Sequence, residues 1–264
     1  MAQHPFLFWP RSLLLAAACI FATAAAAQGE EPVETVTMVQ DAGYPPYMMQ
    51  TVSGPQGIYA DIIREADRRM PGYEIDLRAL PWPRALHLVS TGRVQALLGT
   101  YYRPTTRPWL REYSAALLYE SVFVFCRKGV AQKGWTYPDD FSGLVFGNNS
   151  GFSTPGSAFF DMVARGEIFL NEEQTTDLNL KLLHLGRADC YVQDKSVVDP
   201  ILDQGQYDRI EPVKQLTYEA AFVGLAETWA PAAADRFKME LDRVLKDMRQ
   251  DGTVDRIVFS NIMD

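Results

Sequence analysis

Short apolar segments typical of β-strands alternate with segments of helical period along most of the chain, and this alternation constrains the fold more than any other feature. In residues 36–98, a strand-like run is followed by a helical run, a second strand, a second helix and a third strand. Residues 144–192 repeat the same order. Strands that alternate with helices across short connections indicate a mostly parallel sheet with helices on its faces. The sequence therefore predicts an α/β fold.

The two series share one closely similar part. Residues 88–96 and 182–190 each contain the end of a helix, a Gly-Arg pair and a strand that leads to polar residues. Two lobes of similar architecture, each presenting a strand end to a shared cleft, would produce such a repeat. After residue 218, a short apolar strand precedes an amphipathic helix that starts near Ala232 and ends near Gly252. From its pattern alone, this tail either caps the second series or completes the first.

The first 27 residues differ from the rest of the chain. Arg11 is their only formally charged side chain, and residues 12–26 form an uninterrupted run rich in Leu and Ala. A positive charge, a short apolar run and small residues after it are the pattern of a secretory signal peptide, so we predict cleavage after Ala27. A lipoprotein anchor at Cys19 is the competing interpretation. The mature protein is expected to be free in an exported compartment, which the family resemblance described below narrows to the periplasm.

The charge and the cysteines limit the partners and the chemistry. The formal net charge of −8 becomes −9 when residues 1–27, which carry one arginine and no acid, are removed. An acidic chain is a poor match for nucleic acid or for an anionic membrane surface. Only Cys126 and Cys190 remain after cleavage, and an exported compartment permits a disulfide between them. Two buried free thiols fit the sequence equally well.

Polar and aromatic residues directly follow the third strand of the first series. The apolar run 94–98 ends at Gly99, after which come Thr100, Tyr101 and Tyr102. A strand that stops at this glycine would place the three side chains at the C-terminal edge of the sheet. That edge is where α/β folds bind small molecules.

Arg107 is the candidate anion-binding residue at this edge. We expect it at the start of a short helix, because Pro108 suits a first helical turn. A guanidinium beside free backbone N–H groups favours a carboxylate. The alternative is that Arg103, Arg107 and Arg111 form a solvated face. Position favours Arg107, since it follows a strand end with hydroxyl and aromatic groups beside it.

Several short motifs occur in the order and at the spacings of a known family. They are Gly57-Ile58-Tyr59-Ala60-Asp61, Gly92-Arg93-Val94-Gln95-Ala96, Arg103-Pro104-Thr105-Thr106-Arg107 with Tyr113-Ser114, and Gly186-Arg187-Ala188-Asp189 with Asp194. With them the chain resembles the bacterial extracellular solute-binding proteins of family 3, the periplasmic receptors of polar amino-acid ABC transporters. The resemblance covers essentially the whole mature chain.

The resemblance implies a two-lobed periplasmic-binding-protein fold of type II, in which each lobe is a mostly parallel sheet flanked by helices. Two hinge crossings, at residues 122–126 and near Tyr218, join lobes that close on ligand. The implied first lobe is residues 33–123 and 218–264, which includes the C-terminal helix, and the second is residues 124–217. The implied partners are a small-molecule ligand and the inner-membrane subunits of an ABC permease, and the receptor acts as a monomer.

The resemblance also assigns roles in the site. The arginine that matches Arg107 pairs with the α-carboxylate of an amino acid, and the acid that matches Asp194 accepts its α-ammonium. Ser153 matches a second-lobe donor to the carboxylate. A zwitterion held by one cation and one anion on opposite lobes favours closure, and each charged hydrogen bond contributes about 1.5–3 kcal/mol. The remaining predicted contacts come from the strand end and from loops: Asp41, Tyr44, Trp82, Thr100 and Tyr102.

Four positions depart from the amino-acid receptors of the family. Gly99 and Tyr102 stand where small hydroxyl residues are usual. Tyr59 replaces an acid, and Phe152 replaces a hydroxyl residue beside the predicted donor. The anion site matches the family, whereas the surrounding pocket does not match a specific receptor. The predicted ligand is therefore an α-amino acid or another small carboxylate.

The leading interpretation is a non-catalytic receptor that feeds an ABC permease and needs neither a metal nor another cofactor. The alternative is an enzyme of the cyclohexadienyl dehydratase type, since these dehydratases are similar to the family in fold. Such an enzyme needs a protonatable acid near the carboxylate-binding arginine, and Asp194, Glu219 and Asp41 are the candidates. A detached sensor domain is a third interpretation, which the lack of an effector segment in this sequence disfavours.

Overall fold

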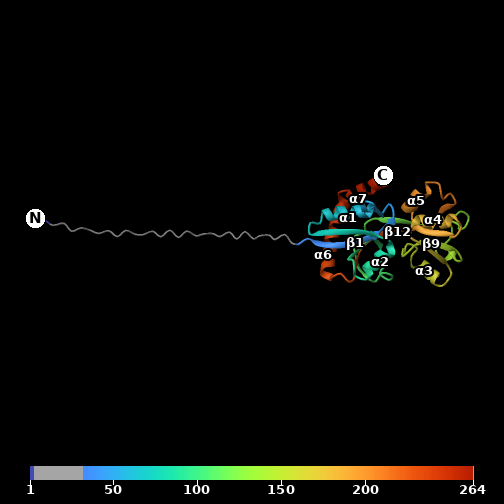
Figure 1. Cartoon of the computed structure of the whole chain (residues 1–264), viewed down its shortest axis with the longest axis horizontal. Coiled ribbons are helices and arrows are strands. Elements are labelled where there is room, and N and C mark those ends of the chain that lie inside the picture. The colour runs from blue at the N-terminus through green and yellow to red at the C-terminus, as the bar shows by residue number, and fades with distance from the viewer. Residues whose placement is uncertain (3–31, 264) are drawn as a thin grey trace. The chain divides into compact units, whose positions relative to one another are not determined.

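A computed structural model describes residues 1–2 and 32–263 (Figure 1). The predicted cleavage after Ala27 and the alternative anchor at Cys19 lie outside the described residues. The strands are β1 (Glu34–Asp41), β2 (Gly43–Tyr44), β3 (Met48–Thr51), β4 (Gly54–Gln56), β5 (Tyr73–Leu80), β6 (Ala96–Tyr101), β7 (Leu110–Tyr113), β8 (Tyr119–Arg127), β9 (Val145–Asn149), β10 (Phe169–Glu173), β11 (Cys190–Asp194) and β12 (Ile210–Ala226). The helices are α1 (Ile58–Arg68), α2 (Trp82–Ser90), α3 (Ser157–Ala164), α4 (Thr176–His184), α5 (Lys195–Leu202), α6 (Pro231–Gln250) and α7 (Thr253–Met263), with a 3-10 turn, η1, at Asp139–Phe141. Over this described range, no helix is both long and apolar enough to span a membrane.

Most of the strands form one sheet in the order β10-β9-β11-β8-β12-β6-β1-β5, and β7 pairs with β12 beside it. β1 pairs parallel with β5 and β6, and β9 pairs parallel with β10 and β11. In the middle of the sheet, β8 and β12 run antiparallel to their neighbours. Strands β2, β3 and β4 form a separate small antiparallel sheet. The mostly parallel sheet that the sequence predicts is confirmed.

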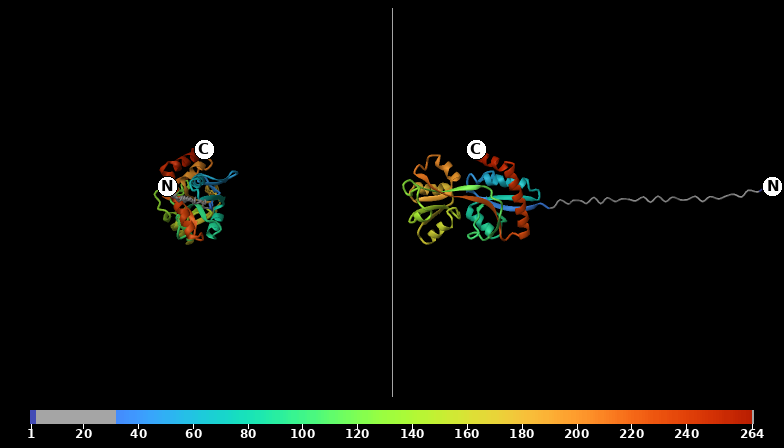
Figure 2. Two further views of the ribbon diagram at one scale, coloured as in Figure 1. Left: turned by 90° about the vertical axis from the view of Figure 1, so that its left-hand side faces the viewer. Right: turned by 180° about the vertical axis from the view of Figure 1, so that it is seen from behind.

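The two long strands β8 and β12 join the two halves of the sheet. They pair from Arg127 with Ile210 to Tyr119 with Ala220, and β12 then continues from Ala221 to pair with β6. In the right-hand view of Figure 2, the two strands cross together between the halves. The result is two α/β lobes. The first lobe contains β1, β5, β6, α1, α2, α6 and α7, and the second contains β9, β10, β11, α3, α4 and α5.

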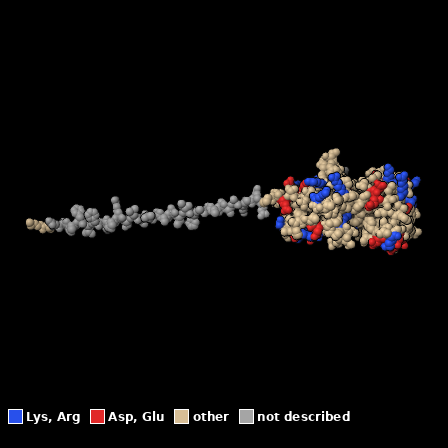
Figure 3. Space-filling model, turned by 60° about the horizontal axis from the view of Figure 1, so that its bottom comes forward, with Lys and Arg blue, Asp and Glu red and all other residues tan. Residues whose placement is uncertain are grey.

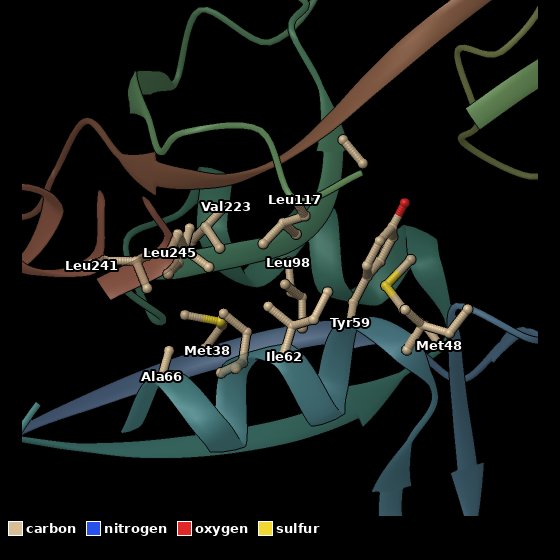
Figure 4. Close-up of a cluster of buried hydrophobic side chains, with 14 of the residues drawn as sticks. Met38, Met48, Tyr59, Ile62, Ala66, Leu98, Leu117, Val223, Leu241 and Leu245 are labelled. Atoms are coloured by element: carbon tan, nitrogen blue, oxygen red, sulfur yellow. The ribbon is translucent and has the colours of Figure 1, made fainter. Parts of the chain in front are cut away.

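Each lobe has its own apolar core. In the first lobe, α1 and α6 pack on the sheet, and Figure 4 shows Met38, Ile62 and Leu98 close together in this core. The second core forms around Phe146 and Phe159. Burying a large apolar side chain contributes about 1.5–3 kcal/mol. The apolar stripe of α6 is buried in the core of the first lobe, so α6 completes that lobe. The sequence pattern alone also allows α6 to cap the second lobe. The buried residues of that stripe are Phe237, Leu241, Val244, Leu245 and Met248.

Three parts of the fold differ from the sequence expectation. The small β2–β4 sheet occupies a segment expected as a loop. Helices α5 and α7 are not expected from the sequence, because Pro200 lies inside α5 and α7 begins directly after Gly252. The one start signal of α5 is Asp194, its N-cap. Strand β12 spans 17 residues, but its first part mixes exposed polar with apolar residues. Only its apolar end, residues 222–225, is recognisable from the sequence.

Cys126 of β8 and Cys190 of β11 stand opposite each other in the sheet and form a disulfide. The sequence allows either this bridge or two free thiols, and the structure shows the bridge. Both cysteines are buried in the core of the second lobe. The bridge therefore ties the crossing strand β8 to the second lobe.

Charged side chains are spread over the surface. On the face shown in Figure 3, basic and acidic groups lie near one another on the folded part of the chain. Many of them form exposed ion pairs, such as Arg243 with Glu240 and Asp247. Exposed pairs contribute little to stability, because water screens them. The two apolar cores therefore hold the fold together.

Gly57, between β4 and α1, has a backbone conformation that disfavours other residues. Its φ is 109°, and a Cβ there would lie 2.5 Å from the carbonyl oxygen of Tyr47. We expect Gly57→Ala to lower the free energy of unfolding by about 1–3 kcal/mol, measured by urea denaturation. Gly72→Ala is the matched control, since no atom lies within 4 Å of its Cβ position. Equal stability of the two variants would show that this backbone tolerates a side chain at Gly57.

Candidate functional site

A cavity lies between the two lobes, near the C-terminal end of β6. The walls are mainly aromatic, and two ionisable side chains of opposite sign, Arg107 and Glu120, line it. The space open to the centre of a water molecule is about 20 Å³, which is room for about one water. The lining residues are Tyr44, Met48, Trp82, Gly99, Tyr101, Arg107 and Glu120, with Phe152, Ser153 and Thr154 from the loop after β9.

Arg107 is buried in this site without an acidic partner. Its side chain is 5% exposed, Nη1 donates to Thr100 Oγ1 at 2.5 Å, and the guanidinium carbon lies 5.4 Å from the centre of the Trp82 ring. Burial lowers the pKa of Arg107 to about 10, which still leaves the group charged at neutral pH. Among the described residues, no carboxylate offsets this desolvation. A buried cation of this kind is suited to bind an anion that comes from solution.

The expectation that Arg107 begins a short helix is wrong. Its backbone N–H donates to the carbonyl of Arg103 at 2.8 Å, and its own carbonyl accepts from Leu110, where β7 begins. The chain makes a single turn here, because Pro104 and Pro108 lack the N–H groups that would continue a helix. Binding of an anion therefore rests on the guanidinium rather than on a helix N-terminus.

Strand β6 does not stop at Gly99, as the sequence suggests, but continues to Tyr101. The pairing with β12 skips Gly99, which has a φ of 78° and is the extra residue of a bulge. Directly after the bulge, Thr100 accepts the hydrogen bond from Arg107. The next residue, Tyr101, donates to Glu120. The bulge thus supplies contacts to both ionisable groups of the cavity.

Glu120 of β8 is fully buried and is surrounded by tyrosine hydroxyls. Tyr44 and Tyr101 donate to its Oε2 and Tyr59 donates to its Oε1, each at 2.6 Å. In Figure 4, the Tyr59 hydroxyl points out of the apolar core of the first lobe. Burial, and next the charge of Asp194, raise the pKa of Glu120 to about 7, while the three hydrogen bonds oppose this rise. Within the described part of the chain, no basic side chain pairs with it.

The raised pKa of Glu120 predicts that stability falls as the pH rises. The pKa is about 7 in the folded protein, against an ordinary value of 4.5, so the folded state holds the proton more tightly. The stabilisation from this group is complete below about pH 4 and is lost as the pH rises through about 7, by about 3 kcal/mol in total. Glu120→Gln should remove this part of the dependence in urea denaturation over this pH range.

The control for this prediction is a second buried acid. Burial raises the pKa of Asp41 to about 6, which gives a slope of the same sign in the wild-type protein and in Glu120→Gln alike. The difference between the two proteins therefore isolates Glu120. Parallel pH curves for the two would mean that Glu120 titrates as it does in an unfolded chain.

Asp194 lies at the end of β11 and caps α5. Its Oδ1 accepts from the backbone N–H of Ser196 at 2.8 Å and from the Tyr47 hydroxyl at 3.1 Å. Its Oδ2 has no hydrogen-bond partner among the described residues. Burial raises the pKa of this carboxyl. Asp194 is thus near the tyrosine cluster, but it is not part of the cavity lining.

Four of the other predicted site residues come together around the cavity. Tyr44, Trp82 and Ser153 line it, and Thr100 is buried against the arginine. The rings of Tyr44 and Trp82 contact Phe152 of the second lobe, with ring centres 5.3 and 5.7 Å apart. The Ser153 hydroxyl is buried without a hydrogen-bond partner in the described chain.

Besides Asp194, two predicted site residues lie away from the cavity and from Arg107. Asp41, at the end of β1, is buried and accepts from the backbone N–H of Gly43 at 3.1 Å. Tyr102 is 58% exposed, and its ring packs against Tyr113. In this arrangement neither side chain reaches the space beside the arginine.

Hydrogen bonds connect the lobes at the cavity. Trp82 Nε1 and Arg107 Nη2 both donate to the carbonyl oxygen of Gly151, at 3.2 and 3.3 Å. Arg103 donates to the carbonyl oxygen of Ser153 at 3.4 Å. Since the lobes touch here and the space is small, a ligand the size of an amino acid would fit only after they separate. On its outer side, Arg107 also borders a wider surface groove.

Glu120 is the main site residue that was not predicted from the sequence. The apolar run after it reads as a strand, but the strand begins earlier, at Tyr119, and Glu120, Val122, Val124 and Cys126 are all buried. With the period of two in a strand, these residues share one face. Glu120 lies two residues before Val122, so the period of the strand places it on the same buried face. This position of an acid is the sequence signal that could have identified Glu120. The other site residues without a sequence assignment are Tyr47, Met48 and Thr154.

The fold is similar to that of several solved structures. A mutant of ArgBP from T. maritima matches with a TM-score of 0.70 at 15% identity, over 87% of this chain and 96% of that one. A putative L-cystine ABC transporter from Listeria monocytogenes gives 0.72 at 15% identity, over 87% and 96%. The ancestral amino acid-binding protein AncCDT-1, a precursor of cyclohexadienyl dehydratase, gives 0.66 at 17% identity, over 86% and 95%. At these identities the likeness shows the fold, which is the predicted type II periplasmic-binding fold.

Sequence comparison identifies the family. A search of curated proteins finds no match. The family model of the bacterial extracellular solute-binding proteins, family 3, matches residues 36–260, which is nearly all of the described chain. Because this match spans both lobes and the buried arginine between them, the protein belongs to the bacterial extracellular solute-binding proteins of family 3.

Proposed function

We propose that the protein is a periplasmic receptor that binds a small carboxylate or amino acid between its lobes and delivers it to an ABC permease. The observation that carries the proposal is Arg107, a buried guanidinium that lines the cavity and has no carboxylate partner in the described residues. Burying a charge without a partner costs free energy. A ligand carboxylate that supplies the missing charge explains the place of this side chain.

The lobes separate to admit the ligand and then close on it. Arg107 belongs to the first lobe, whereas the free hydroxyl of Ser153 belongs to the second and is able to donate to the same carboxylate. A ligand that contacts both lobes stabilises the closed arrangement by the difference between its affinities for the closed and open forms. The family resemblance implies Asp194 as the acceptor for a ligand ammonium, and Glu120, which lines the cavity, is a second candidate acceptor.

The division into lobes follows from this mechanism. We assign residues 33–123 and 218–264 to the first lobe and residues 124–217 to the second, so that both exchanges between lobes lie within β8 and β12. Residues 1–27 are the export signal, and the receptor acts in the periplasm as a monomer. Neighbouring genes for a permease and an ATPase would support the delivery step.

The names of the solved relatives support an amino-acid ligand. ArgBP and the L-cystine transporter protein point to amino acids, and AncCDT-1 is described as an amino acid-binding protein. We propose that the ligand of this chain is also an amino acid, but we do not assign a particular amino acid to it. Gly99 and Phe152 replace residues that the specific receptors use around the anion site.

Thermal-shift screening of L-amino acids and small organic acids tests the proposal. A ligand that binds only the folded protein raises its Tm by mass action. We expect at least one carboxylate to raise the Tm of the wild-type protein, and we expect the shift to vanish in Arg107→Ala. A ligand that stabilises Arg107→Ala equally well would place the binding site elsewhere. The absence of any stabilising carboxylate would reject the proposal.

A second candidate function is catalysis of the cyclohexadienyl dehydratase type. Glu120 favours it, because this acid lines the cavity with Arg107 and its pKa of about 7 lets it donate a proton near neutral pH. Such an enzyme would bind the side-chain carboxylate of the substrate at Arg107 and protonate the ring hydroxyl. The hydroxyl leaves as water while the ring carboxylate leaves as CO2, and the electrons of the broken C–C bond complete the aromatic ring. Turnover of prephenate or arogenate that disappears in Glu120→Gln would support this function. A wild-type protein that turns over neither compound would contradict this second function.

A further inference from the structure

We propose that Glu120, rather than Asp194, accepts a positively charged nitrogen of the ligand, so that the site selects small zwitterions held between Arg107 and Glu120. This inference rests on the proposed receptor function and narrows its ligand class. Its basis is that the two residues are ionisable groups of opposite sign that line one cavity, and that in the described chain neither has an ion-pair partner.

The free acceptor position of Glu120 supports this role. An ionised carboxylate has about four acceptor positions. Tyr44 and Tyr101 occupy two on Oε2, and Tyr59 occupies one on Oε1. One position on Oε1 is therefore left for a ligand N–H. The tyrosines fix the carboxylate in place, so a ligand would not have to order it.

Asp194 is less suited to the same role. Two of its acceptor positions are used by Ser196, as the cap of α5, and by Tyr47. Its free Oδ2 is buried, but the side chain is not part of the cavity lining. A ligand nitrogen in the cavity beside Arg107 would therefore share that cavity with Glu120 and not with Asp194. Because of its free oxygen, Asp194 is the competing acceptor and the matched control.

The walls of the cavity also favour a cation with a compact apolar body. The rings of Tyr44, Tyr101, Trp82 and Phe152 line the space together with Met48. Aromatic faces attract cations, and most strongly where water is excluded. A plain organic acid of the same size would satisfy Arg107 but would leave Glu120 without a positively charged partner. The site should therefore prefer an amino acid over the same molecule without its amino group.

Paired probes test this preference directly. The probes are L-alanine, L-leucine and L-phenylalanine, each compared with its analogue that lacks the amino group: propionate, 4-methylpentanoate and 3-phenylpropionate. Affinities come from titration calorimetry of the full mature protein. For the best-bound pair, we expect the amino acid to bind the wild-type protein about 10- to 100-fold more tightly than the plain acid, as for one charged hydrogen bond.

The variants show which acid is responsible. In Glu120→Gln, the affinity for the amino acid should fall to that of the plain acid, whose affinity should change little. Glu120→Asp, which keeps the charge, should retain part of the preference, and Asp194→Asn should retain all of it. The ratio between the two probes is informative even if a variant is less stable, because a general defect lowers both affinities alike.

The outcomes separate this inference from the proposed function. Plain acids that bind as well as amino acids, and need Arg107, would uphold the receptor but overturn the role of Glu120. A preference that disappears in Asp194→Asn and persists in Glu120→Gln would also overturn it. If none of the probes binds, or if all bind Arg107→Ala unchanged, the proposed site and this inference both fail.

Discussion

Removing the disulfide with the double substitution C126A/C190A is expected to lower the free energy of unfolding by about 4 kcal/mol. The bridge joins β8 to β11 across a sequence separation of 64 residues. Its loss frees that length of unfolded chain, which raises the entropy of the unfolded state. Urea denaturation of the variant and of the oxidised wild-type protein at one pH measures the difference.

Wild-type protein that is refolded with a reducing agent is the control for this experiment. It should show most of the same loss, because it also lacks the bridge. Ligand binding should persist in both proteins under conditions where they remain folded, since the cysteines lie in the core of the second lobe and outside the cavity lining. An unfolding midpoint that does not depend on the bridge would contradict its structural role.

Arg107→Met is expected to abolish ligand binding and, at the same time, to stabilise the ligand-free protein. Losing one partner of a buried charged pair costs about 2–5 kcal/mol of binding free energy. Without ligand, the guanidinium is buried with only neutral partners, Thr100 and the carbonyl oxygen of Gly151. An apolar side chain of similar length avoids this desolvation, so the free energy of unfolding should rise by about 1–2 kcal/mol.

Arg111→Met is the matched control, because the sequence offers Arg111 as an equivalent arginine. Arg111 donates to Asp235 and to the carbonyl oxygen of Pro231, away from the cavity. Its loss should leave ligand affinity unchanged. Titration calorimetry gives the affinities, and urea denaturation without ligand gives the stabilities. Wild-type affinity in Arg107→Met would remove the basis of the proposed function.

The α/β architecture is readable from the sequence because its signals are local. The stripe of α6 and the alternation of strands and helices depend on side-chain period, which burial on one face imposes. The first part of β12 and the turn at Arg107 are not readable in this way. β12 is defined by its partners β8 and β6. The turn depends on two prolines whose effect the sequence alone leaves open.

The two charged residues of the site, Arg107 and Glu120, also differ in how far local sequence predicts them. Arg107 is predictable because it lies a few residues after the end of β6, in the same short segment as the hydroxyl and aromatic groups beside it, so its position is set by nearby sequence. Glu120 matters because Tyr44, Tyr59 and Tyr101, from three separate elements, meet around it. Sequence spacing alone does not bring these hydroxyls together. They meet only in the folded chain, where β2, α1 and β6 contribute one tyrosine each. The sequence therefore predicts the anion site but not the acid that completes the cavity.

The account depends on Arg107 holding a ligand carboxylate between the lobes, and a crystal structure with a ligand from the thermal-shift screen tests this most directly. We expect a carboxylate oxygen of the ligand within about 2.7–3.2 Å of an Arg107 guanidinium nitrogen, with groups of both lobes around it. A ligand bound elsewhere, with Arg107 still bonded only to Thr100 and the Gly151 carbonyl, would contradict the account.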